Sequence, residues 1–373
     1  MEKIYKIIDY FENVETRKEH NGYTFSVGRM LTIVILGSMC GLRNISDIHQ
    51  WASNKRVREF LWKHFGILSI PSYYWLLCLL KLIKPESLNQ CFINWTQYLI
   101  SDENRNKTVS FDGKTVRSTG KMKKYESPLH IVSAQLGELG ITIGQKAVEG
   151  KSNEIPAVRD LIKLLDINGC MVVADALNCQ TETIKVIIKG GGDYLLNVKD
   201  NQETLKEDIE DYVQDGELRE TMDKATTTEK NRDRIERRTA YVTNDIDWIE
   251  DKDKWESLAC IGAINRQFII NNEKSNEWHY YISSRPLTAE ELLKYTRLEW
   301  SVESMHWLLD VHFEEDFCRI EDRNIQQNLN IARKIALNSI RNYKNKTNSK
   351  RAISKILLDC FLESDEIISI LSI

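Results

Sequence analysis

The sequence predicts an α/β protein, with a mixed-sheet core over residues 105–345 that follows an all-α region over residues 1–104. Three observations support this prediction. Up to about residue 100, apolar residues recur at helical spacing. From residue 107, short β-rich runs alternate with helical segments, as in a mixed sheet flanked by helices. From about 217 to 290 the pattern becomes strand-like again, which indicates a β-rich insertion within the core.

The first hundred residues are expected to form several helices with short connections. An apolar helix is predicted over 72–83, between Pro71 and Pro85, and another over 87–100. The most apolar run, Met30 to Leu42, is shorter than a membrane span. The start of the chain lacks the continuous apolar centre of a signal peptide, so we expect a cytoplasmic protein. The eight cysteines are scattered without a C-x-x-C pair, which favours reduced thiols over a zinc site.

The core elements follow in order. A strand over 107–111 is expected to end at Asp112-Gly113, and a hairpin joins 130–136 to 141–148 through Gly137–Gly140. A helix over 154–167, started by Ser152 or Asn153, precedes an apolar strand over 170–176. Alternating helices and strands continue to 214. After the insertion, one long helix is expected from the Thr288 cap to about 311, another over 325–343, and a helical tail over 346–373. This order is compatible with an RNase H-like core.

Basic residues are concentrated in two segments, although the net charge is −4. Nine Lys or Arg residues and no acid lie between Arg323 and Leu358, and five Lys or Arg and no acid lie between Gly113 and Tyr125. Either segment alone could be a solvated surface. Together they favour a phosphate-bearing partner. The candidate phosphate contacts are Lys114, Arg117, Lys199, Arg333, Lys334 and Arg341.

Two aspartates follow expected strands. Asp112 ends one strand, and Asp175 ends the most apolar one, VVAD. Because open sheets place ligands at the carboxyl ends of their strands, both side chains are candidates for a metal site. Alternatively, Asp112 belongs to a simple turn and Asp175 caps a helix.

A third carboxylate is expected from the helix RLEWSVESMHWLLDV. At 100° per residue, Glu299, Glu303 and Asp310 share one face, with Trp300 and Trp307 along its edge. The tryptophans offer flat surfaces on which an unpaired base could stack. The alternative is an ordinary solvated face with aromatic residues at the border of the core.

The motifs SFDGKTVRST, EGKSNEIPAVRDLIKLLDINGCMVVADALNCQ, GGDYLLNVKDNQ and EWSVESMHWLLDVHFEED occur in this order. They resemble the H-repeat-associated insertion-sequence transposases of the DDE superfamily, and the first hundred residues resemble that family's N-terminal associated domain. The chain departs from the family pattern at Glu299 and Asp200, where extra negative charge lies near the expected site.

The resemblance implies Asp112, Asp175 and Glu303 as the catalytic and metal-binding residues, with Mg²⁺ as cofactor and Mn²⁺ as its substitute. It also implies cleavage at the ends of a mobile element and strand transfer into target DNA. Double-stranded DNA would be the partner, the enzyme would act as a homodimer on two paired ends, and DNA-bound protein would associate with the nucleoid. Without a cation, each pair of carboxylates about 4 Å apart would repel by roughly 4 kcal/mol, so we expect a raised pKa in the site.

Two alternatives remain open. One is a decayed or domesticated transposase that binds DNA without cleaving it. The other is a metal-dependent phosphohydrolase of small substrates, which the two basic segments disfavour.

Overall fold

The first hundred residues are helical in the computed structural model. The structure describes residues 2–17, 25–100, 107–117, 119, 128–149, 153–231, 234–270 and 273–373. The N-terminal helices are α1 (Glu2–Glu12), α2 (Val27–Met39), α3 (Ile45–Ser53), α4 (Lys55–Phe65), α5 (Tyr73–Leu82) and α6 (Pro85–Leu99). Among the described residues, no helix combines the length and the apolar character needed to cross a membrane.

A nine-stranded mixed sheet runs through the rest of the described chain in the order β3-β2-β1-β4-β5-β9-β8-β7-β6. Its first part contains β1 (Thr108–Val116), β2 (Leu129–Leu136), β3 (Ile141–Glu149), β4 (Met171–Ala174) and β5 (Asp193–Val198). β2 is antiparallel to both β1 and β3, while β4 runs parallel to its neighbours β1 and β5. The expected hairpin is confirmed, with Gly140 at φ +63° in its turn.

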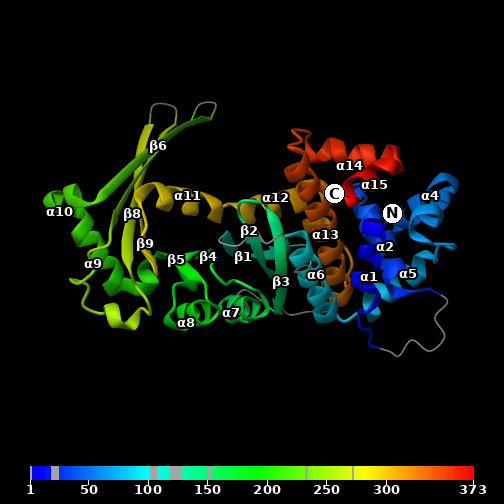
Figure 1. Ribbon diagram of the computed structural model, residues 1–373, viewed down its shortest axis with the longest axis horizontal. Helices are drawn as coiled ribbons and strands as arrows, with labels where there is room; N and C mark the ends of the chain where they lie inside the picture. The colour runs from blue at the N-terminus through cyan, green and yellow to red at the C-terminus, as the bar shows by residue number, and fades with distance from the viewer. Residues whose placement is uncertain are drawn as a thin grey trace.

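The insertion extends this same sheet. It contains β6 (Asp223–Asn231), β7 (Arg234–Thr243), β8 (Cys260–Ile270) and β9 (Glu273–Ser283), and β9 pairs with β5. In Figure 1 these long strands project from the sheet on the side away from the N-terminal helices. The insertion and the acidic residues therefore share one continuous β-structure.

Helices cover both faces of the sheet. The helices α7 (Glu154–Leu164), α8 (Thr181–Lys189) and α9 (Glu203–Gln214) lie on one side, and α11 (Ala289–Glu299) and α12 (Ser301–Phe313) lie on the other, as Figure 1 shows. The alternation of buried residues explains this arrangement. Val172 packs with the α7 and α8 side, whereas its neighbour Val173 packs with the α11 side.

The helix α13 (Arg323–Thr347) is buried along most of its length. It belongs to one hydrophobic core that joins the N-terminal helices to α12 and to the C-terminal helices α14 (Ile353–Leu362) and α15 (Ser364–Leu371). The N-terminal helices and the C-terminal tail therefore pack together, although they lie at opposite ends of the sequence.

Several elements differ from the sequence-based expectations. β1 does not end at Asp112 but continues to Val116, because it stays paired with β2 across Asp112. The long helix expected after Thr288 is two helices, which meet at Trp300. The expected helix over 154–167 ends at Leu164. Ser152 and the basic residues Lys121, Lys123 and Lys124 lie outside the described residues.

Candidate active site

Asp112 and Asp175 lie side by side on neighbouring parallel strands. Phe111 of β1 is in register with Ala174, the last residue of β4, so Asp112 of β1 lies beside Asp175, which follows β4 directly. Adjacent strands are about 4.8 Å apart. Asp175 is exposed, and the side chain of Asp112 keeps 35% of its surface open to solvent. Neither carboxylate is sealed in the interior.

Glu303 comes from the first turn of α12, which packs on β1 and β2. Two buried side chains tie the junction between α11 and α12 to the sheet. The Ser110 hydroxyl donates to the Leu298 carbonyl at 3.0 Å, and the Gln135 amide donates to the Ser301 carbonyl at 2.8 Å. Since Ser110 lies two residues before Asp112 on β1, these bonds fix the start of α12 relative to the aspartates.

Negative charge accumulates around these residues. Burial, followed by the charge of Glu154, raises the pKa of Asp112 to about 7, and Glu303 and Asp175 add to the rise. Burial also raises the pKa of Glu299 to about 7, with contributions from Asp175, Glu303 and Asp112 that Lys199 partly opposes. The pKa of Asp112 is raised in the expected direction, but burial and Glu154 contribute more to the rise than the expected repulsion from Glu303 and Asp175. We call Asp112, Asp175, Glu299 and Glu303 the acid cluster.

Two histidines lie behind Asp112. The Nε2 atom of His306 is 3.5 Å from Oδ2 of Asp112, and burial, with Lys334 and Lys114, lowers the pKa of His306 to about 3. The ring is therefore neutral at pH 7. On the other side, buried His130 lies 3.0 Å from Oε2 of Glu154.

Gly113 explains why His130 and Glu154 can approach Asp112. A Cβ atom at position 113 would lie 2.3 Å from Nε2 of His130 and 2.7 Å from the carboxylate of Glu154. The residue after Asp112 must therefore be a glycine for this arrangement to form.

Aromatic and basic side chains surround Glu303 on the solvent side. Trp300 is 49% exposed and Trp307 is 60% exposed, and both line a shallow hollow together with Glu303. Lys199 is exposed just after β5, as expected. The structure adds Arg266 from β8 of the insertion, whose guanidinium lies 5.7 Å from the ring centre of Trp300.

Four of the proposed phosphate contacts are buried, enclosed or paired with carboxylates rather than free to bind DNA. Arg333 and Lys334 are buried in α13, because that helix runs through the core. Lys334 donates to the Ser133 hydroxyl and to the Gln145 amide oxygen, both at 2.7 Å. Arg341 is largely enclosed, packed against Gly140.

Lys114 is the fourth of these residues. Its side chain is 11% exposed and forms ion pairs with Asp310 and with Glu315, the latter at 3.1 Å. Asp310 lies seven residues after Glu303 on α12 and so shares its face as expected, but its carboxylate pairs with Lys114. Arg117 stays exposed and remains a candidate phosphate contact.

Sequence reasoning missed His306, Glu154 and Arg266. His306 had a signal, since it lies three residues after Glu303 and thus one helical turn away. Glu154 and Arg266 come from distant elements, and nothing in their local sequence points to the acid cluster.

The donors of the acid cluster suit a hard divalent cation, because they are carboxylate oxygens and their neighbours raise the pKa of Asp112 and of Glu299. Within the described part of the chain, no three His, Cys, Asp or Glu residues form a group that could hold an ion. The chemistry of the residues fits a cation, and their side chains must approach one another to coordinate it.

Comparisons with known proteins show which family the chain is similar to. Residues 104–339 match the family described as Transposase DDE domain, and residues 8–96 match the family described as DDE_Tnp_1-associated. The chain is 31% identical to YbfL of Escherichia coli (strain K12), over 96% of this chain and 95% of that protein. It is also 31% identical to YhhI of the same strain, named as an H repeat-associated transposase, over 90% of this chain and 92% of that protein.

A solved structure of a piggyBac transposase synaptic complex with hairpin DNA is similar with a TM-score of 0.48. The alignment has 9% identity and covers 99% of this chain and 80% of that chain. This likeness is too weak to carry an argument.

Proposed function

The chain belongs to the DDE transposase family, among the H repeat-associated proteins, and we propose that it cleaves DNA at the ends of an insertion sequence and joins the freed strand to target DNA. The observation that carries the proposal is the register that sets Asp112 beside Asp175, with Glu303 close enough to raise the pKa of Asp112. The strand order β3-β2-β1-β4-β5, with β4 and β5 parallel to β1, supports an RNase H-like core.

Asp112, Asp175 and Glu303 would hold two Mg²⁺ or Mn²⁺ ions, which when bound activate the attacking oxygen and stabilise the leaving oxygen. The remaining steps belong to the protein. Ser110 and Gln135 hold Glu303 in place, and His306 faces Asp112 from the interior.

Side chains at the entrance to the acid cluster would position the DNA strand. Trp300 and Trp307 present exposed rings beside Glu303, on which unpaired bases can stack. Arg117 and Lys199 are exposed and would bind phosphates on either side.

The N-terminal helices would bind DNA through α4. Its exposed side chains include Lys55, Arg56, Arg58 and Lys63, and none of these pairs with a carboxylate among the described residues. A helix with this charge suits the phosphate backbone. Pairing of two DNA ends in one complex would make the active form a homodimer.

An end-cleavage assay tests the function. Asp112→Asn, Asp175→Asn and Glu303→Gln should each abolish Mg²⁺-dependent nicking of a duplex that carries the element's end. Glu207→Gln is a matched control, because Glu207 is exposed on α9, away from the acid cluster. DNA binding in EDTA should be unchanged in all four variants.

Persistent nicking by any of the three cluster variants would refute the assignment of the acid cluster. A wild-type protein that binds the end but never nicks it would instead support a decayed transposase. Glu299→His tests that alternative separately, because it removes a half-buried carboxylate that adds negative charge to the cluster; nicking gained by this variant would support a decayed enzyme.

A further inference from the structure

The two faces of the insertion sheet carry different side chains. Cross-strand pairing places Thr228, Arg237, Gln267 and Asn276 in one row across four strands. Lys224, Thr226 and Lys230 extend the row along β6, because alternate residues of a strand share a face. We call these seven residues the polar face; each is exposed.

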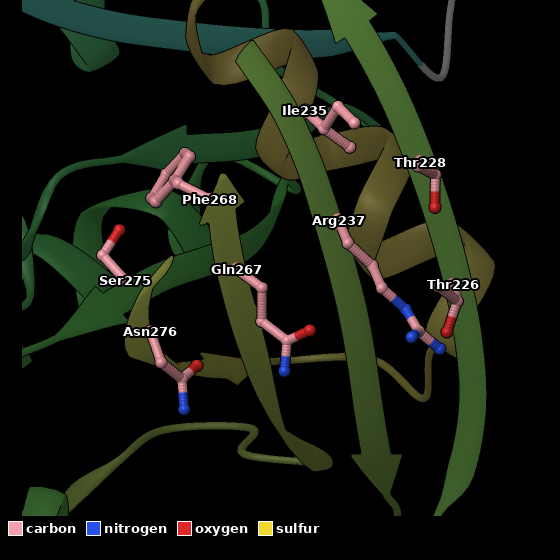
Figure 2. A pocket seen from close by; sticks show the side chains of 8 residues that line it. All are labelled: Thr226, Thr228, Ile235, Arg237, Gln267, Phe268, Ser275 and Asn276. Carbon is pink, nitrogen blue, oxygen red and sulfur yellow. The ribbon is translucent and has the colours of Figure 1, made fainter. Parts of the chain in front are cut away.

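The polar face is hollowed. Figure 2 shows Arg237, Gln267 and Asn276 projecting from neighbouring strands into one depression, with Thr226 and Thr228 at its border. The depression has a volume of about 680 Å³ and is also lined by Ile235, Phe268 and Ser275. Hydrogen-bonding side chains from four strands therefore border one depression, whose lining also includes apolar groups.

Every charged side chain of the polar face is basic. Lys224, Lys230 and Arg237 carry positive charge, and no carboxylate lies among the described side chains of this face. The opposite face differs in carrying a carboxylate, since Glu236 binds both Arg238 and Arg266 there. A chain with net charge −4 thus presents three basic side chains and, among its described residues, no carboxylate on this side of the insertion.

The chemistry of the polar face matches a DNA backbone. Lys, Arg, Thr, Asn and Gln are the side chains that usually donate hydrogen bonds to phosphate oxygens. Four strands about 4.8 Å apart place the ends of the Thr228–Asn276 row about 14 Å apart, which is comparable with the major groove width of about 12 Å. One row can therefore reach phosphates on both sides of a groove.

The polar face is turned away from the acid cluster. On the side of the sheet that carries the polar face, Ala263 and Tyr280 pack with residues of α9. On the other side, Ala240 and Ile264 pack with α11, which leads to Glu299 and Trp300. A duplex on the polar face is thus separate from the strand at the acid cluster of the same subunit.

We propose that the polar face is a second DNA-binding surface, which holds a duplex by its phosphates on the side of the insertion opposite α11. The inference rests on the proposed function, because it assumes that the protein acts on DNA. It assigns to the insertion a duplex that the acid cluster does not contact directly.

The test is binding of a fluorescent duplex in EDTA, measured by anisotropy at several salt concentrations. Arg237→Ala should raise the Kd about tenfold and reduce the slope of log K against log[salt] by about 0.9, the value for one lost phosphate contact. Arg237→Lys should keep most of the affinity. Lys189→Ala, which removes an exposed charge at the end of α8, should bind like wild type.

Wild-type affinity in Arg237→Ala, or an equal loss in Lys189→Ala, would overturn the inference while leaving the proposed function in place. So would a change in molar mass on light scattering without a change in DNA affinity, because the face would then bind a second copy of the chain. Absence of any DNA binding by the wild type would refute the proposed function itself.

Discussion

Lys334 should make the stability of the protein depend on pH in a way that one substitution removes. Burial of its ammonium lowers the pKa from 10.5 to about 7, although Glu315 opposes the change. Between pH 7 and 10.5 the unfolded chain binds a proton at Lys334 that the folded chain does not. The contribution of Lys334 to the free energy of unfolding therefore rises with pH across this window and is lost as the pH falls toward 7.

The magnitude follows from the two pKa values. The full shift of about 3.5 pH units corresponds to about 5 kcal/mol, at about 1.4 kcal/mol per unit. Between pH 7.5 and 9.5, Lys334 is mostly protonated in the unfolded chain and mostly neutral in the folded chain. The free energy of unfolding therefore rises by about 2.5 kcal/mol across this range. Lys334→Met keeps the length of the side chain and removes the titrating group.

Urea unfolding of wild type and Lys334→Met, followed by circular dichroism at pH 7.5, 8.5 and 9.5, tests this reasoning. The wild type should gain about 2.5 kcal/mol relative to the variant across that range. Loss of the bonds to Ser133 and Gln145 adds an offset that does not depend on pH, so the slope is the relevant quantity. Lys355→Met, at an exposed position of α14, is the control and should show no slope. An identical pH dependence in wild type and Lys334→Met would show that Lys334 is protonated throughout and that the reasoning is wrong.

Three further predictions concern the acid cluster. Gly113→Ala should destabilise the protein by about 1–3 kcal/mol, because its Cβ would collide with the ring of His130; an unchanged melting temperature would contradict this. Gln135→Leu should slow nicking at unchanged DNA affinity, because the Ser301 carbonyl at the start of α12 loses its partner; a loss of affinity with a normal rate would argue against a positioning role. Trp307→Ala should change stability by less than about 0.5 kcal/mol but weaken binding of a single-stranded tail by about 1–3 kcal/mol relative to a blunt duplex; equal effects on both would exclude base stacking.

The sequence was sufficient to locate Asp112 and Asp175, because each follows a run of β-branched and apolar residues. It was not sufficient to set the end of β1. The pair Asp112-Gly113 is typical of a turn, and only the close approach of His130 explains a glycine inside a paired strand.

Nothing in the sequence around Trp300 predicted the break between α11 and α12. The segment from Ala289 to Phe313 contains neither glycine nor proline, so helical periodicity continued through it. The break depends on tertiary hydrogen bonds from Ser110 and Gln135, which come from strands more than 160 residues earlier.

The burial of Arg333 and Lys334 could have been anticipated. Both lie within NLNIARKIALNSI, where apolar residues occur on every side of the helix rather than on one stripe. A helix that is apolar all round is buried, and basic residues inside it must find partners in the interior. Lys334 does so with Ser133 and Gln145.

The continuous sheet gives the insertion a structural role in the proposed reaction. β5, which precedes Lys199, pairs with β9, and β9 carries Asn276 of the polar face. The same four strands pack on α11, whose end bears Glu299 and leads into Trp300. A duplex held on the polar face would therefore lie at a fixed distance from the acid cluster, because no flexible linker separates the two surfaces within the described strands. If target DNA occupies the polar face, this sheet should set the spacing between strand-transfer sites. Shortening β6 to β9 by equal numbers of residues at their outer ends should then weaken DNA binding without changing the nicking rate.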